Sequence, residues 1–287
     1  MRFDNRRKQF RSILNGDRCV YPGSVFDPIS ARIAEDIGFE VGMFAGSIAS
    51  FTVLGAPDVI VLTLSEFAQQ AQRINRSSEL PLMVDADHGY GNALNVKRTV
   101  EELEMAGVSG MSIEDTELPQ PFGSVGRTKL LSIPEGVGKM KAALDGRQDP
   151  NLIIAGRTSA PGVTNMEDAL ERAMAYEKVG VDAIFLVGVK TKEQLEKISD
   201  AISIPIILGG GGSSDMMDLD YLSAKNVRIC LQGHQPFSAA VKAIYDTMKA
   251  LREGTTTEEL QGIASAELMG KVTKNNDYED MFDKYLK

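Results

Sequence analysis

Eight short runs of apolar, often β-branched residues alternate with longer segments in which apolar residues recur every three or four positions. Such runs are typical of strands buried on both faces of a parallel sheet, whereas the segments between them predict amphipathic helices. We expect strands at residues 20–25, 41–45, 81–85, 110–114, 152–157, 183–187, 205–208 and 228–231. Several helical segments end at a glycine, such as Gly107 or Gly180, that suits a left-handed C-cap.

The eightfold strand–helix order predicts the fold, because parallel strands need crossover helices and eight such units can close into a (β/α)8 TIM barrel. An open doubly wound sheet is the alternative, but Phe26-Asp27-Pro28 follows the first strand where a dinucleotide fold would carry GxGxxG. We predict one α/β barrel domain spanning residues 1–287. This domain includes an N-terminal helix at about residues 3–15 and a C-terminal helical extension at about residues 254–287, and the extension is expected to pack on a neighbouring subunit.

Composition restricts the classes of partner and the compartment. The 287 residues are 43% hydrophobic and 25% charged, as in a globular protein with a substantial core, and the net charge of −9 argues against nucleic acid or anionic membrane as partners. The N-terminal segment lacks an apolar stretch before a cleavage site, and no run of about 18 apolar residues occurs. Cys19 and Cys230 lie in strand-like runs, which predicts buried thiols and a reducing cytoplasm.

Acidic residues stand where the predicted strands end. Asp85 and Asp87 close the third strand, Glu114 closes the fourth, and Asp58 follows the second. Side chains alternate with period two, so Asp85 and Asp87 point to the same side, at the face where barrel active sites lie. With only two histidines in the chain, this oxygen-rich set predicts Mg²⁺, with Mn²⁺ as the alternative. The competing interpretation is that these acids cap helices or pair with Arg or Lys.

Other strand ends carry candidate substrate-binding groups. Arg157, after the fifth strand, can hold a carboxylate bidentately or serve only as an ion-pair partner. His234, after the eighth, reaches the same rim unless it is a structural histidine. Gly46, Ser47 and Ile48 follow the second strand, where their backbone N–H groups can approach an oxyanion or simply form a turn.

Neither a phosphate-binding site nor a Schiff-base lysine is predicted from the sequence. The Gly209–Gly212 run after the seventh strand lies where barrels often bind phosphate, but we interpret it as a flexible connector. A Schiff-base mechanism lacks a lysine inside strands five to seven, and Lys190 is expected to face solvent.

Several segments carry a family resemblance: SVFDPISARIAEDIGFE, LPLMVDADHGYGNALNVKRTVEELEMAG, IEDTELP, EGVGKMKAAL, AGRT and VRICLQGHQPF. Together they resemble the isocitrate lyase and phosphoenolpyruvate mutase superfamily, over roughly residues 10–250, and look most similar to its oxaloacetate decarboxylase branch. The resemblance implies a barrel whose eighth helix is exchanged between subunits, a homotetramer built as a dimer of dimers, and Mg²⁺ with a 2-keto acid substrate.

The resemblance also implies roles for individual residues. Asp85 is similar to the direct metal ligand, and the remaining acids, Asp58, Asp87 and Glu114, are similar to those that hold metal-bound waters. For the substrate, the implied groups are Ser47 with the neighbouring amides of Gly46 and Ile48, together with Arg157 and the branch-specific His234.

One departure from the family matters for the reaction. The lyases carry a catalytic cysteine on the loop after the fourth strand, where this chain reads TELPQPFG at residues 116–123. The resemblance to the decarboxylase branch then implies Mg²⁺-dependent decarboxylation of oxaloacetate, or a close 3-carboxy-2-keto acid, to pyruvate and CO₂. The alternatives are a carbon–carbon lyase similar to 2-methylisocitrate lyase, a phosphonate-processing enzyme, and a non-catalytic keto-acid-binding regulatory protein.

Overall fold

The computed structural model describes residues 3–124, 126–210 and 214–287. Within them, eight parallel strands pair in sequence order. The strands are β1 (Gly23–Ser24), β2 (Gly42–Phe44), β3 (Leu82–Asp85), β4 (Gly110–Glu114), β5 (Ile153–Thr158), β6 (Ala183–Leu186), β7 (Ile206–Leu208) and β8 (Val227–Cys230). A parallel bridge between Val20 and Ile229 joins the chain before β1 to β8. Each expected run overlaps one strand, with ends that differ by at most three residues, so the predicted α/β barrel is confirmed.

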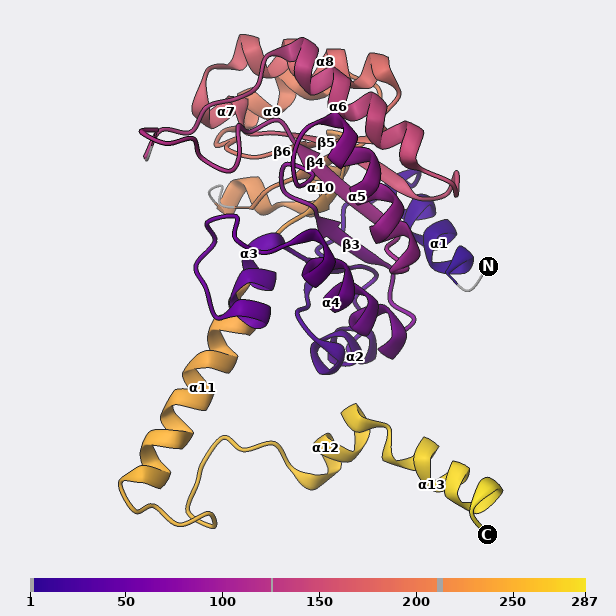
Figure 1. Ribbon diagram of the computed structural model, residues 1–287, viewed down its shortest axis with the longest axis vertical. Helices are drawn as coiled ribbons and strands as arrows, with labels where there is room; N and C mark the ends of the chain where they lie inside the picture. Colours follow the sequence, from indigo (N-terminus) through magenta and orange to yellow (C-terminus); the bar gives the residue numbers. More distant parts are fainter. Residues whose placement is uncertain (1–2, 125, 211–213) are drawn as a thin grey trace.

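Helices follow the strands around the outside of the barrel (Figure 1). They are α2 (Pro28–Asp36), α4 (Leu64–Ser77), α5 (Ala93–Met105), α6 (Ile133–Gly146), α8 (Met166–Val179), α9 (Lys192–Ser199) and α10 (Leu219–Ala224). Side chains fix several of their starts: Asp27 with Ser30, and Thr63 with Glu66, form capping boxes. Gly180, at φ +102°, ends α8 as expected.

Two helical segments lie at positions where no helix was expected from the sequence. The first combines α3 (Gly46–Ala49) with a π-helical turn at Ser50–Leu54, and the second is α7 (Ala160–Val163). Both are short and follow a strand directly, so too few residues are available for a 3.6-residue apolar period to show.

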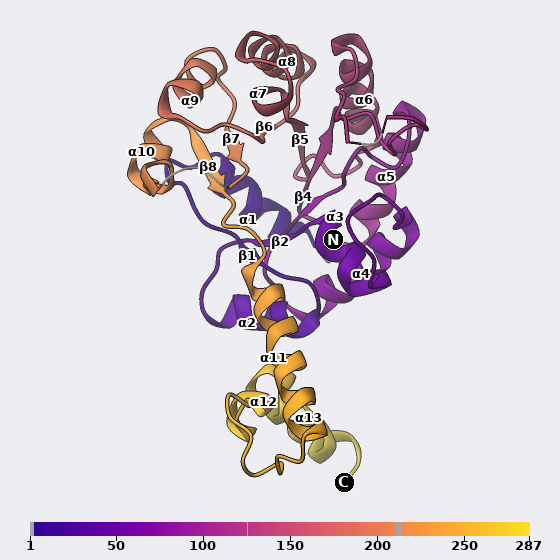
Figure 2. The ribbon, with the colours of Figure 1, turned by 90° about the vertical axis from the view of Figure 1, so that its left-hand side faces the viewer.

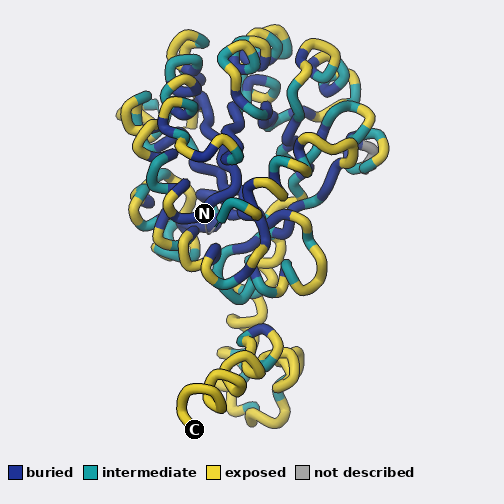
Figure 3. The backbone as a smooth tube through the Cα atoms, turned by 90° about the vertical axis from the view of Figure 1, so that its right-hand side faces the viewer, coloured by how far each residue is buried: buried dark blue, intermediate teal, exposed yellow. Residues whose placement is uncertain are grey.

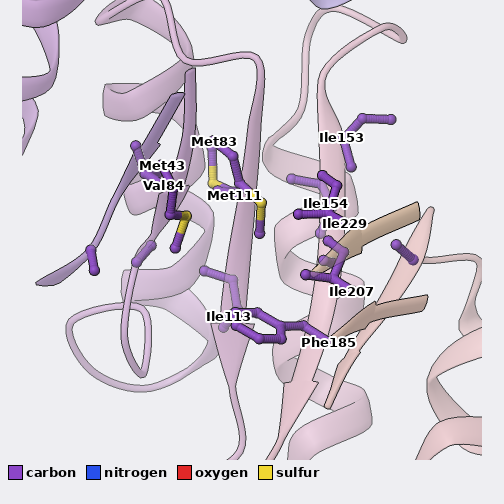
Figure 4. Close-up of a cluster of buried hydrophobic side chains, with 14 of the residues drawn as sticks. Met43, Met83, Val84, Met111, Ile113, Ile153, Ile154, Phe185, Ile207 and Ile229 are labelled. Atoms are coloured by element: carbon purple, nitrogen blue, oxygen red, sulfur yellow. The ribbon is translucent and has the colours of Figure 1, made fainter. Parts of the chain in front are cut away.

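The core lies inside the barrel and beneath the helices, and Figure 3 shows the buried segments of the chain gathered in the interior of the barrel. Buried side chains from seven strands, β2 to β8, meet in one cluster (Figure 4); they include Met43, Met83, Met111, Ile154, Phe185, Ile207 and Ile229. Cys19 and Cys230 are buried free thiols, as predicted. No described helix is long and apolar enough to cross a membrane.

The chain ends extend the barrel in different ways. Helix α1 (Asp4–Leu14) packs against it and buries Phe10 fully. Helix α11 (Gln235–Arg252) instead projects away from it, followed by α12 (Ala266–Thr273) and α13 (Asn275–Tyr285) (Figures 1 and 2). No residue of α11 is buried. Helices α12 and α13 therefore make up the helical part of residues 254–287.

Candidate active site

A cavity of about 640 Å³ opens where β2, β3, β4, β5 and β8 end. It is lined by seven residues named from the sequence: Ser47, Asp58, Asp85, Asp87, Glu114, Arg157 and His234. Apolar side chains, among them Met43, Phe185 and Leu231, form the rest of its wall. Leu118, Pro119 and Gln120 line it from the loop after β4. The apolar residues were not identified from the sequence, because nothing in their types points to a site, whereas the loop was identified only as the place where the lyases carry a cysteine.

The strands set the positions of the carboxylates. Asp85 is the last residue of β3 and Glu114 the last of β4, and both are nearly buried, at 8% and 5% exposed. Asp87 follows with its backbone at φ +47°, and its carbonyl accepts a 2.8 Å hydrogen bond from the Glu114 amide. A side chain at Gly46 would overlap the Asp87 carboxylate, so only glycine permits this close approach.

Repulsion and burial shift the protonation of this cluster. Burial, followed by the charges of Asp85, Glu114 and Asp58, raises the pKa of Asp87 well above its ordinary value. Burial also raises the pKa of Glu114 to about 7, although Arg157 acts in the opposite direction. Desolvation and the charge of Asp85 raise the pKa of Asp58. Burial is thus the largest cause of each shift, and repulsion from the neighbouring Asp85 carboxylate adds to all three.

Arg157 lies among these acids. Its guanidinium contacts the Asp85 carboxylate through Nη1 and the Glu114 carboxylate through Nη2, the latter at 3.1 Å. The pairing follows from strand register, since Arg157 stands directly opposite Glu114 in the β4–β5 ladder. Its guanidinium carbon also lies 5.4 Å from the centre of the Phe185 ring. Arg157 therefore forms ion pairs in the structure, as one of the two interpretations expected. Binding of a substrate carboxylate by Arg157 is a further role that remains to be tested.

Two serines, neither identified from the sequence, hold members of this site. Ser112 Oγ, fully buried on β4, donates a 2.9 Å hydrogen bond to Asp85 Oδ1. Ser24 Oγ, at the end of β1, lies 2.7 Å from Nδ1 of His234. The acids were identified because polar residues at the C-terminal ends of barrel strands line the active site, a criterion that we call the strand-end rule. The same rule would have indicated Ser24, but the first strand was expected to continue to residue 25.

Two other residues named from the sequence, Ile48 and Lys190, do not line the cavity. Ile48 packs its side chain in the core at 2% exposed, and only its backbone is part of the first turn of α3. Lys190 is exposed, as expected, and does not line the cavity. Of the Gly209–Gly212 run, Gly211 and Gly212 lie outside the described residues.

The oxygen atoms that line the cavity are suitable ligands for a hard divalent cation. Four carboxylates and no thiol line the cavity, and oxygen ligands are those that Mg²⁺ and Mn²⁺ prefer. Across residues 3–124, 126–210 and 214–287, no three His, Cys, Asp or Glu side chains are grouped so as to hold one ion directly. Because Mg²⁺ commonly binds through one or two carboxylates and several waters, the set fits one direct ligand with water-mediated partners.

An eight-stranded barrel that brings carboxylates, an arginine and a histidine into one cavity at its C-terminal face has the architecture of an α/β-barrel enzyme. The chain belongs to the phosphoenolpyruvate phosphomutase family, whose model matches residues 10–252. This confirms the superfamily indicated by the sequence motifs.

Similar proteins cover nearly the whole chain. A protein of Rhodopseudomonas palustris (strain BisB18) named oxaloacetate decarboxylase is 58% identical, over 96% of this chain and 94% of its own. A second with this name, from R. palustris (strain BisA53), is 52% identical over 100% and 98%. Two solved structures have a TM-score of 0.86. One is an oxaloacetate acetylhydrolase in complex with 3,3-difluorooxalacetate, 27% identical over 98% of this chain and 97% of its own. The other is a phosphonopyruvate hydrolase in complex with oxalate and Mg²⁺, 26% identical over 98% and 99%.

Proposed function

We propose that this protein catalyses the Mg²⁺-dependent decarboxylation of oxaloacetate to pyruvate and CO₂. The observation that carries the proposal is the cavity that joins the acidic cluster to Arg157 and His234. Relatives of 52% identity or more over almost the full chain are named for this activity, which supports the choice of substrate.

Asp85 would hold the cation directly, with Asp58, Asp87 and Glu114 holding its water ligands. When bound, Mg²⁺ supplies Lewis-acid withdrawal of electrons from the 2-keto group of the substrate. Mn²⁺ would supply the same chemistry.

The chain's own groups bind and orient the substrate. Arg157 grips the C1 carboxylate end, and His234 orients the C4 carboxylate so that the C3–C4 bond stands perpendicular to the C2 carbonyl plane. When that bond breaks, CO₂ leaves, and its electron pair forms the enolate of pyruvate. Gly46, Ser47 and Ile48 begin α3, so their backbone N–H groups have no partner four residues back in the helix. They would donate to the enolate oxygen, each good donor contributing about 3 kcal/mol.

Protonation of the enolate at C3 completes the reaction, and solvent can supply the proton. No thiol lies on the described part of the loop after β4, and both cysteines are buried elsewhere. A carbon–carbon lyase that needs a positioned thiol acid on this loop therefore finds no support in these residues.

The test is product formation from oxaloacetate with Mg²⁺ present and after exhaustive chelation, with pyruvate, acetate and oxalate all quantified. Because Mg²⁺ alone decarboxylates oxaloacetate slowly, Asp85→Ala protein with the same Mg²⁺ is the matched control. We expect pyruvate from the wild type and only the background rate from the variant. Acetate and oxalate would indicate hydrolysis instead, and binding of oxaloacetate without turnover would indicate a regulatory protein.

We further propose that the chain forms a homotetramer through an exchanged α11, as the family resemblance implies. An apolar stripe runs along α11, because its apolar residues recur at helical spacing and are 43–66% exposed: Val241, Ile244, Tyr245, Met248 and Leu251. An apolar groove of about 450 Å³ lies between α2 and the start of α11, where a second copy can pack. Light scattering on the wild type and on Ile244→Asp tests this; an unchanged mass would contradict it.

We also propose a cytoplasmic location, because the two buried cysteines are free thiols, which suit a reducing compartment.

A further inference from the structure

The hydrogen bond between Ser24 and His234 joins two residues that are 210 positions apart in sequence. The closure of the barrel brings them together: Ser24 ends β1, His234 follows β8, and the Val20–Ile229 bridge joins these two edges. His234 is also the N-cap residue of α11, yet its side chain makes no capping hydrogen bond. Its ring is therefore held by Ser24 rather than by its own helix.

We propose that Ser24 is a positioning residue that fixes the tautomer and orientation of His234, so that Nε2–H is presented to the substrate carboxylate that departs. This inference rests on the proposed function for the identity of that carboxylate. The tautomer itself can be measured without any substrate.

The chemistry of the two groups leads to this tautomer. Burial lowers the pKa of His234, although Asp85 acts in the opposite direction, so the ring is neutral near neutral pH and carries one proton. A carboxylate only accepts hydrogen bonds, and the cavity wall already carries four of them. A lone pair at Nε2 would therefore repel the substrate, whereas Nε2–H attracts it.

A serine hydroxyl can supply what this tautomer requires. With the proton on Nε2, Nδ1 is an acceptor, and Ser24 Oγ–H can donate to it over 2.7 Å. Among the described residues, Ser24 Oγ has no other hydrogen-bond partner. Nδ1 is therefore the one described protein acceptor for its hydroxyl proton, whereas a backbone carbonyl in place of Ser24 would select the opposite tautomer.

Kinetics on matched variants test the positioning role. Ser24→Ala should lower kcat for oxaloacetate about tenfold through loss of orientation while KM changes little, and Ser24→Thr, which keeps the hydroxyl, should recover most of the loss. Ser159→Ala is the control, because Ser159 follows β5 and makes no side-chain capping bond. If Ser24 acts through His234, adding Ser24→Ala to His234→Asn should cost nothing further. Independent, multiplying losses would overturn the inference.

The tautomer has its own spectroscopic signature. The chain holds two histidines, so ¹⁵N-imidazole spectra of labelled protein contain two rings, and His234→Asn identifies the signals of His234. We expect protonated Nε2 and unprotonated Nδ1 in the wild type, and a mixture of tautomers in Ser24→Ala. A wild-type ring protonated at Nδ1, or a Ser24→Ala spectrum identical to the wild type, would refute the proposal.

The two readouts separate failure of this inference from failure of the proposed function. If the wild type does not turn over oxaloacetate, the function is wrong, but the spectra still decide whether Ser24 sets the tautomer. If the wild type is active and Ser24→Ala equals it in kcat and spectrum, the function stands and the inference fails. If Ser24→Ala loses activity only in proportion to a lowered melting temperature, its role is structural and the inference is wrong.

Discussion

Replacing Arg157 with Met tests the electrostatics of the cavity directly. Arg157 has a side chain 18% exposed and pairs with Asp85 and Glu114, whose side chains are 11% and 7% exposed. Methionine keeps an unbranched apolar side chain against Phe185 but removes the charge. The substitution therefore leaves the acids without the guanidinium that compensates them.

The expected magnitude follows from this burial. Removing one partner of a buried ion pair leaves an uncompensated charge and costs about 3–5 kcal/mol. Repulsion between the Asp85 and Glu114 carboxylates acts in the same direction. At about pH 8, above the raised Glu114 pKa of about 7, that carboxyl is mostly ionised in the wild type. We expect Arg157→Met to lower the free energy of unfolding by about 3 kcal/mol in chelator-treated protein, since partial proton uptake relieves some of the repulsion.

Urea denaturation at a fixed protein concentration measures this loss. Arg98→Met is the matched control: Arg98 pairs with Glu102 on the surface of α5, at 67% and 35% exposed, and such pairs contribute about 0–1 kcal/mol. Added Mg²⁺ should stabilise Arg157→Met more than the wild type, because the cation then replaces the lost charge. A loss below about 1 kcal/mol, equal to that of the control, would refute this account of the cavity.

Three other outcomes are expected. Ser112→Ala, which removes the 2.9 Å hydrogen bond to Asp85, should weaken Mg²⁺ binding about tenfold by calorimetry; unchanged affinity would mean that Ser112 does not orient the ligand. Lys139→Met should lower the free energy of unfolding by about 1–2 kcal/mol in urea, because the buried His88 carbonyl loses a 2.7 Å charged donor, and a stability equal to the wild type would contradict this. Neither isocitrate nor 2-methylisocitrate should yield glyoxylate or succinate, since residues 116–123 lack a cysteine acid; release at rates comparable to pyruvate formation would show another acid at work.

The barrel could be predicted because its signal is distributed over the whole chain. Eight apolar runs separated by helix-length segments leave few alternatives, and errors of one or two residues at each strand end do not alter the topology. The short helical segments at residues 46–54 and 160–163 were missed because their conformation is set by the strand ends and loops around them. Local sequence carries too little periodic pattern over four or five residues.

The residues that line the candidate site could be predicted from the sequence, but the contacts between their side chains could not. The strand-end rule places acids, Arg157 and His234 at one rim, because every parallel strand delivers its last residues to the same face. Which side chains touch depends instead on strand register. Asp85 stands opposite Ser112 in the β3–β4 ladder, and Glu114 stands opposite Arg157 in the β4–β5 ladder.

Register also explains why these contacts form one unit. A shift of one residue between β4 and β5 would turn Arg157 away from the cavity, because neighbouring side chains on a strand point to opposite faces. Asp85 would then keep its bond to Ser112 on β4 but lose its only cation among the described ion pairs. The packing of the barrel interior fixes the register of β4 against β5. It therefore also determines how much of the carboxylate charge Arg157 compensates and how much is left for a bound cation.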